Sequence, residues 1–174
     1  MPPLLLVRHA RAGTRGTGPS DLARPLDERG RSQAAALPDL LLPLLGHGRG
    51  AGDPPGAAPS TEEDDASRPV VASSPARRCI ETVTPLAVAL GTLVTVDEAL
   101  VEGADARQLH ERLAALRRPT VWSSHGDVIP ELLAMLARRG LDLGPDASCR
   151  KGSTWVLDVE GGTVRDAHHL PPPA

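Results

Sequence analysis

Two histidines and two arginines stand at similar points of the sequence, each close to the end of a short strand-like run. Arg8 and His9 directly follow the aliphatic run "LLLV". Arg78 comes shortly after "VVASS", and His125 comes directly after "TVWSS". Arginine matches phosphate oxygens with paired N–H donors, and a neutral imidazole is a nucleophile. These residue types predict a site that holds a phosphoryl group and transfers it to a histidine.

The elements that must position these side chains are short strands alternating with helices. Strand patterns cover 4–7, 70–74, 93–96 and 120–124, and a helical pattern follows each of them along the chain. This alternation predicts an α/β fold with a mostly parallel central sheet, and "STWVLDV" with "TVRDA" predicts a closing hairpin. In open α/β sheets ligands bind outside the carboxyl ends of the strands. We therefore expect the four side chains to converge there.

The start of the helix after the second strand decides where Arg78 lies. Ser74 is predicted to be its N-cap and Pro75 its first residue, because serine accepts from free amides and proline tolerates the first helical position. This start puts Arg78 in the first turn, at the exit of the strand. The free N–H groups of a helix start are further donors for an anion.

Composition and charge limit the classes of function. The length of 174 residues suits one domain, 1–174, with a mobile surface insertion at 46–69 that is rich in Gly and Pro. Its acidic run "EEDD" is interpreted as solvated rather than metal-binding. A net charge of -3 argues against a broad basic surface for nucleic acid or anionic membranes. An aromatic content of 1% leaves few platforms on which bases could stack.

Location, redox state and cofactors are predicted from simple patterns. No secretory signal or membrane-spanning run is recognised, so a cytoplasmic location is expected. Cys79 and Cys149 lie far apart without CxxC spacing, which favours two reduced thiols, and Cys79 is expected to pack inside a helix. His47, His168 and His169 lack the spacing of metal ligands, so no metal or other cofactor is predicted.

Three segments, in order, resemble a known family. "VRHARAG", "SSPARRCIETV" and "SSHGDVIPELL" are similar to the successive motifs of the histidine phosphatase superfamily, which includes the phosphoglycerate mutase-like enzymes. With "RPLDERGRSQA", the chain is most similar to small bacterial SixA-type phosphohistidine phosphatases. It also resembles the phosphatase half of Nudix hydrolase fusions, although it contains no Nudix motif. The resemblance implies a single-domain, three-layer α/β/α sandwich of the phosphoglycerate mutase-like type.

The resemblance also implies roles for individual residues. His9 would be the nucleophile that becomes phosphorylated. The phosphate pocket would consist of Arg8, Arg78, His125 and Gly126. No metal would take part, because fixed cations would neutralise the phosphoryl oxygens.

Three features of the chain depart from the usual family pattern. Ala10 stands where the family usually has glycine, which should narrow the loop slightly. The usual acidic proton donor is matched by Glu102, and less well by Glu98 or Asp105, and SixA-type members can lack this acid. The short segment 93–119 leaves little room for a substrate-capping insertion, so an open site is expected.

The predicted function is hydrolysis of a phosphoric monoester or a phosphohistidine through a phosphorylated His9. Two alternatives stay open. One is a phosphoglycerate mutase-type phosphotransferase, and the other is a phosphate-recognising regulatory or binding protein without turnover. The expected partner is a small phosphorylated substrate or a phosphohistidine protein. Trp122, Trp155 or an arginine plane keeps nucleotides among the candidate substrates, and the oligomeric state is not predicted.

Overall fold

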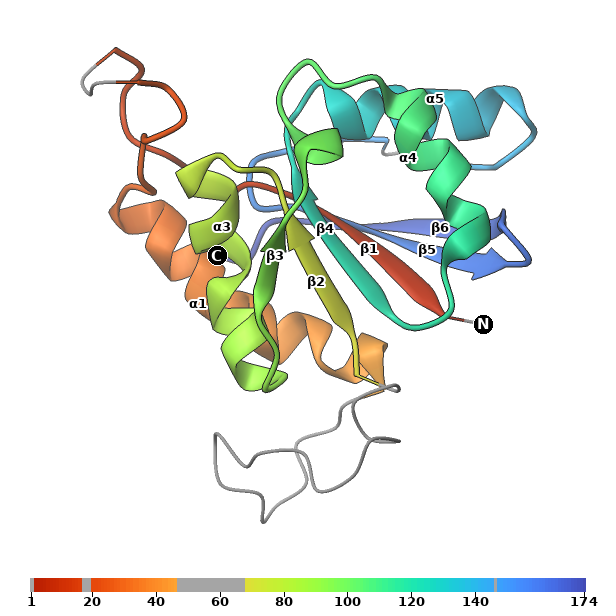
Figure 1. The fold of residues 1–174 in the computed structure, drawn as a ribbon, viewed down its shortest axis with the longest axis horizontal. Coiled ribbons are helices and arrows are strands. Elements are labelled where there is room, and N and C mark those ends of the chain that lie inside the picture. The colour runs from red at the N-terminus through yellow and green to blue at the C-terminus, as the bar shows by residue number, and fades with distance from the viewer. Residues whose placement is uncertain (1, 17–19, 47–67, 146) are drawn as a thin grey trace.

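The structure is a computed structural model that describes residues 2–16, 20–46, 68–145 and 147–174 (Figure 1). Short aliphatic strands and amphipathic helices alternate along these ranges, as the sequence predicts. In chain order the elements are β1 (Pro3–Arg8), α1 (Glu28–Leu41), η1 (Pro43–Leu45), β2 (Val70–Ser73), α3 (Arg77–Ala89), β3 (Val94–Val96), η2 (Glu98–Leu100), α4 (Ala106–Arg112), η3 (Leu113–Ala115), β4 (Thr120–Ser124), α5 (Val128–Arg138), β5 (Thr154–Glu160) and β6 (Thr163–Leu170).

The strands form one six-stranded sheet in the order β3-β2-β4-β1-β5-β6. The first four strands in this order run parallel to one another, whereas β5 pairs antiparallel with β1 and β6. The predicted α/β class, mostly parallel sheet and closing hairpin are therefore confirmed. Arg8 lies opposite Ser124, and Ser73 lies opposite Ser123, so the carboxyl ends of β1, β4 and β2 are level.

Helices cover both faces of this sheet and give the expected three layers (Figure 1). Successive side chains of β1 point to opposite faces, as in any strand. Leu5 and Val7 pack in a core with α1 and α3, whereas Leu4 and Leu6 pack in a second core with α4 and α5. Burying each such aliphatic side chain contributes roughly 1.5–3 kcal/mol. β1 is thus fixed from both sides, and the residues at its end have a rigid base.

The start of α3 differs from the predicted one. Ala76 is the N-cap residue and the helix begins directly after it, so Ser74 and Pro75 lie before the helix. Ser74 Oγ accepts a hydrogen bond from the Ala76 amide at 3.3 Å and also lies 2.8 Å from His125 Nε2. The hydroxyl therefore contacts both the backbone just before α3 and the imidazole of His125. Arg78 nevertheless lies in the first turn, as predicted.

Two further predictions concern whole segments. The expected insertion at 46–69 lies almost entirely outside the described residues, together with His47 and the "EEDD" run. Among the helices that the structure describes, none is long and apolar enough to cross a membrane.

Candidate active site

The side chains predicted from the strand ends meet in one pocket of about 700 Å³ at the carboxyl edge of the sheet. It is lined by all six residues predicted for the site: Arg8, His9, Arg78, Glu102, His125 and Gly126. Glu98 and Asp105, the weaker choices for a proton donor, do not line it. The parallel strands therefore bring together residues that lie more than a hundred positions apart in the sequence.

His9 presents one ring nitrogen without a hydrogen bond to any described residue. The residue directly follows β1 and is 5% exposed. Its Nδ1 lies 2.8 Å from the Ala10 carbonyl oxygen, which can only accept, so Nδ1 carries the proton and Nε2 the lone pair. Burial lowers the pKa of His9 to about 3, and the charges of Arg78, His125 and Arg8 act in the same direction. The imidazole is therefore neutral at pH 7.

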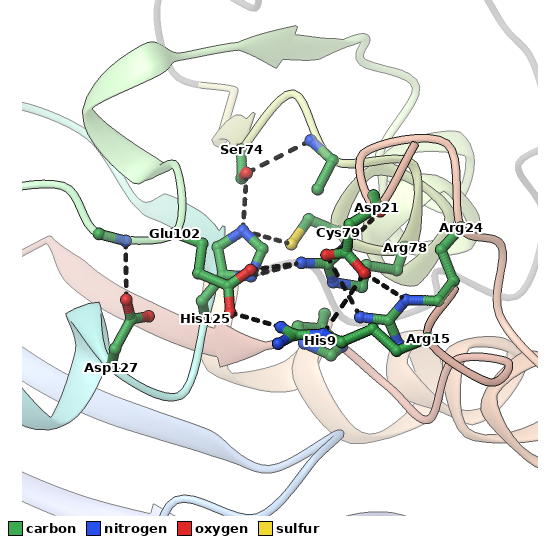
Figure 2. Close-up of polar contacts among 12 residues, drawn as sticks. His9, Arg15, Asp21, Arg24, Ser74, Arg78, Cys79, Glu102, His125 and Asp127 are labelled. Atoms are coloured by element: carbon green, nitrogen blue, oxygen red, sulfur yellow. Dashed lines mark hydrogen bonds and ion pairs between the residues drawn. The ribbon is translucent and has the colours of Figure 1, made fainter. Parts of the chain in front are cut away.

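His125 is held through both ring nitrogens (Figure 2). Its Nδ1 lies 3.4 Å from Arg78 Nη2, which can only donate, so the Nε2–H group donates to Ser74 Oγ at 2.8 Å. Burial, followed by the charge of Arg78, lowers the pKa of His125 to about 4. The ring centroids of His9 and His125 are 5.4 Å apart, so two neutral imidazoles lie side by side at the floor of the pocket.

Arg8 reaches into the pocket because Gly126 has no side chain. A Cβ atom added to Gly126 would lie 2.4 Å from Arg8 Cζ, which is closer than real contacts of this kind. Arg8 Nη1 donates to the Cys149 carbonyl. Its Nε is buried and has no hydrogen-bond partner among the described residues. A buried donor without a partner is costly, and an anion in the pocket would satisfy it.

Arg78 belongs to a ring of alternating charges with Asp21, Arg15 and Glu102 (Figure 2). Although only 1% exposed, it pairs with Asp21 Oδ2 at 3.1 Å and with Glu102 Oε2 at 3.0 Å. Arg15 closes the ring, because its Nη2 lies 3.0 Å from Glu102 Oε1 and its Nε lies 3.5 Å from Asp21 Oδ1. Arg78 Nε is a second buried donor without a partner among the described residues.

Several residues of the site were not identified from the sequence. Arg15, Asp21 and Arg24 come from the irregular loop between β1 and α1, where neither periodicity nor a strand end marks a residue. A hydrogen bond from Arg24 is the main cause that lowers the pKa of Asp21. Lys151 lies in the segment before β5. Ser74 was singled out, but for the helix start rather than for its contact with His125.

Cys79 lies beside the site without the properties of a nucleophile. Its Sγ is 3.5 Å from His125 Nε2, and burial raises the pKa of the thiol to about 12. Both Cys79 and Cys149 are free thiols, as predicted. Within the described ranges no group of three or more His, Cys, Asp or Glu side chains is arranged to hold a metal ion.

Comparison with known sequences finds a relative that is named as a phosphatase. The chain is 33% identical over 177 aligned residues to an 8-oxo-(d)GTP phosphatase of Mycolicibacterium smegmatis. The alignment covers 98% of this chain and 48% of the relative, so the chain spans about half the length of that protein. No protein-family model matches the chain.

Comparison with solved structures defines the fold. A protein of Agrobacterium tumefaciens assigned as the phosphohistidine phosphatase SixA has a TM-score of 0.68 and 19% identity, covering 99% of both chains. A protein of Nakamurella that is also assigned as SixA has a TM-score of 0.68 and 21% identity, and the match covers 99% of this chain and 97% of that one. A mycobacterial glucosyl-3-phosphoglycerate phosphatase reaches 0.62 with 18% identity, covering 100% of both chains.

These neighbours are phosphatases of the class that the sequence motifs resemble. The chain therefore has the same fold as these SixA and glucosyl-3-phosphoglycerate phosphatase structures, and the match covers 99% and 100% of the chain, respectively. Within that fold, the SixA-type proteins are neighbours of nearly the same length as this chain.

Proposed function

We propose that this chain is a metal-independent phosphatase that transfers a phosphoryl group first to Nε2 of His9 and then to water. The observation that carries the proposal is the state of His9. Its imidazole is neutral, protonated on Nδ1 and therefore nucleophilic on Nε2, and it lines the same pocket as two guanidinium groups. Solved neighbours are described in complex with tungstate, VO3 and inorganic phosphate, which supports an oxyanion as ligand.

In the first step, the lone pair of His9 Nε2 attacks phosphorus and the bond from phosphorus to the leaving group breaks. The transferred group carries its charge on three oxygens, so catalysis depends on positioning and on fixed positive charge. Arg8 and Arg78 line the pocket and supply that charge, and the buried Nε group of each has no hydrogen-bond partner among the described residues. The result is a phosphohistidine on His9.

In the second step, water attacks the phosphohistidine, the P–N bond breaks and His9 returns to its neutral form. The Nδ1–H bond to the Ala10 carbonyl keeps the ring in one tautomer through both steps. In the free protein the charge of Arg78 favours the neutral form of His125, whereas the negative charge of a bound phosphoryl group would favour the imidazolium form. His125 then donates to a phosphoryl oxygen.

Glu102 is proposed as the proton donor to the leaving group. It lines the pocket at its rim, is 45% exposed in its side chain, and accepts hydrogen bonds on both carboxylate oxygens from Arg15 and Arg78. A phosphoryl oxygen that binds Arg78 competes with Glu102 for the same guanidinium. Substrate would thereby free one carboxylate oxygen, which would take up a proton from water, pass it to the leaving group, and recover a proton from the water that attacks the phosphohistidine in the second step.

The proposed substrates are phosphoric monoesters or phosphohistidine proteins. We propose that the chain acts on them as a single domain and in the cytoplasm. The relative from Mycolicibacterium adds nucleotides to the substrates to be tested, because it is named for a nucleotide. A panel of protein, sugar and nucleotide phosphates, run with and without a chelator, would identify the class. Activity that a chelator removes and Mg²⁺, Mn²⁺ or Zn²⁺ restores would contradict metal independence.

Trapping of the phosphoenzyme tests the proposed reaction. Rapid quenching during turnover of an aryl phosphate should give an acid-labile, base-stable adduct that peptide mapping assigns to His9. The leaving group should appear in a burst of about one equivalent when the second step is slower. An acid-stable adduct would point to serine or threonine, and neither adduct nor turnover would favour a binding protein. Transfer to an added sugar in preference to water would favour a mutase.

A further inference from the structure

The cations of the active-site pocket differ in whether they have a carboxylate partner. Arg78 pairs with Asp21 and Glu102, and the rim residues Arg15 and Arg24 pair with the same carboxylates. Arg11 pairs with Asp27 at 2.9 Å. Arg8 and Lys151 form no ion pair with any residue that the structure describes. Positive charge is therefore uncompensated on the side of the pocket where these two residues lie.

Lys151 is fixed next to the catalytic end of β1. The neighbouring Gly152 amide donates to the carbonyl oxygens of Arg8 and His9, at 3.1 Å each, and the Arg8 amide donates to the Ser153 carbonyl at 3.0 Å. The backbone on one side of Lys151 is thus tied to the backbone that carries the nucleophile. Lys151 itself lines the pocket.

The surroundings of Lys151 are mainly cationic. Its ammonium group makes no hydrogen bond to the described part of the chain. Partial burial lowers the pKa of Lys151, and the charges of Arg8, Arg24 and Arg11 lower it further. Asp27 opposes them, but it already pairs with Arg11 and caps α1 through the Gly30 amide. Lys151 is exposed and lines the pocket, so its charge adds to that of Arg8 and favours a bound anion.

The pocket has room for more than the transferred phosphoryl group. Its volume of about 700 Å³ is within the range of roughly 300–1,000 Å³ typical of sites for whole small molecules. The phosphoryl pocket proper uses Arg8, Arg78 and His125. Lys151, the only lysine in the sequence, is an additional cation for which that reaction has no use.

We infer that Lys151 forms a second anion subsite, so that the substrate carries another anionic group within a few bonds of the transferred phosphorus. The ligand chemistry is a phosphoryl group with a neighbouring phosphate or carboxylate. This inference rests on the proposed function for the position of the transferred phosphoryl. It deepens that function, because it selects substrates with two anionic groups over simple monoesters.

Equilibrium binding tests the subsite without any turnover. Methylphosphonate, methylenediphosphonate and phosphonoacetate are titrated into the wild type, Lys151→Ala and Lys151→Arg, with Arg139→Ala as a control outside the pocket. The wild type should bind at least one of the two-anion ligands about three- to tenfold more tightly than methylphosphonate. Lys151→Ala should remove most of that advantage, whereas Lys151→Arg should keep it. A phosphate or a carboxylate neighbour is distinguished by which ligand gains more.

Chemical modification gives a second readout on the unaltered protein. Lys151 and the amino terminus are the only amines in the sequence, so an amine-selective acylating reagent should label just these two positions. The two-anion ligand that binds better should slow labelling of Lys151 more than methylphosphonate does, and labelling of the amino terminus serves as the reference within each sample.

Three outcomes would overturn the subsite. Equal weakening of all three ligands in Lys151→Ala would show that Lys151 contacts the transferred phosphoryl group itself and not a second anion. Unchanged binding in Lys151→Ala, or equal labelling of Lys151 with every ligand, would show that no second anion lies there. These results can be distinguished from a failure of the proposed reaction. If no phosphohistidine forms on His9 but binding still depends on Lys151, the proposed phosphatase reaction is contradicted and the anion subsite is not.

Discussion

The floor and the rim of the pocket are built on different physical principles. At the floor, His9, Arg78 and His125 are nearly inaccessible. The two imidazoles are held by hydrogen bonds, and the buried Arg78 guanidinium is held by two carboxylates. At the rim, Glu102 and Arg15 have side chains that are 45% and 68% exposed and are held by ion pairs. Exposed ion pairs contribute only about 0–1 kcal/mol each and are screened by salt. The floor is therefore preorganised for chemistry, whereas the rim is able to rearrange around a substrate.

Removal of the nucleophile is the strongest test of the floor. His9→Ala should lower turnover to below about 1% of wild type, because no other described side chain of the pocket offers a neutral nitrogen in the same place. The rate of aryl phosphate hydrolysis measures the effect, and thermal unfolding checks the fold. His168→Ala, an exposed histidine on β6, is the matched control and should keep full activity. Residual activity above about 1% would refute covalent catalysis by His9.

Replacement of the rim carboxylate should have an effect that depends on the substrate. General acid catalysis is worth about 10² to 10⁴ in rate where the leaving group is poor, and little where an aryl oxide leaves easily. Glu102→Gln should therefore slow an alkyl phosphate by about 10² or more, but an activated aryl phosphate or a phosphohistidine only mildly. Glu98→Gln, a nearby exposed carboxylate outside the pocket, is the control.

The pattern across the three substrates decides the role of Glu102. If Glu102→Gln hydrolyses each of the three substrates as fast as the wild type does, the carboxylate takes no part in catalysis, as in SixA-type members without an acid. An equal loss on all three would indicate that the ring with Arg15 and Arg78 has a structural role, or that Glu102 acts in hydrolysis of the phosphoenzyme.

The contrast between floor and rim also explains what the sequence revealed. Arg8 is the last residue of β1, and His9 and His125 directly follow β1 and β4. Parallel strands bring their carboxyl ends to one edge, so the meeting of these residues could be predicted. Arg15 and Asp21 lie in an irregular loop, where the path of the backbone depends on tertiary contacts rather than on a repeating pattern. The family resemblance identified Glu102 at the rim, but nothing in the sequence indicated its partners.

Ser74 was predicted as the N-cap residue of α3, but the helix begins two residues later than that prediction and the serine also has a tertiary partner. Serine is a common N-cap residue, yet the Ser74 hydroxyl contacts His125, and α3 begins with Ala76 as the N-cap residue.

Lys151 was not predicted as a residue of the pocket, because only tertiary contacts bring it there. It precedes an antiparallel strand, and only the backbone bonds of Gly152 to β1 bring it to the site.

Gly126 offers a test of how tightly the floor is packed. In Gly126→Ala the new methyl group would overlap the Arg8 guanidinium, at 2.4 Å from Cζ, so that Arg8 must move. A displacement of about 1 Å at a reacting site costs up to about 10²-fold in rate, and we expect a loss of roughly 10- to 100-fold in kcat/KM. Gly13→Ala is the control, because its Cβ would meet only the Pro25 carbonyl oxygen at 3.9 Å. A rate equal to wild type in Gly126→Ala would show that Arg8 does not hold the phosphoryl group.

Burial of two neutral imidazoles should make stability depend on pH. The pKa values of His9 and His125 are about 3 and about 4, against 6.5 for an ordinary histidine, chiefly because burial disfavours the charged ring. Between pH 6.5 and these values the unfolded chain binds more protons than the folded one, so stability falls as pH falls. Each ring contributes about 1.4 kcal/mol per pH unit within that window, and nothing above about pH 6.5.

The contribution of one ring is isolated by a difference between two proteins. Urea unfolding of the wild type and of His9→Gln at pH 7, 6, 5 and 4.5 gives the free energy of unfolding of each. Other titrating groups cancel in the difference, and the variant should lose about 1.4 kcal/mol less per pH unit than the wild type below about pH 6. His168→Gln should follow the wild type, because that ring is exposed. Equal slopes in wild type and His9→Gln would mean that folding does not lower the pKa of His9, and would contradict the conclusion that burial holds this ring in the neutral form.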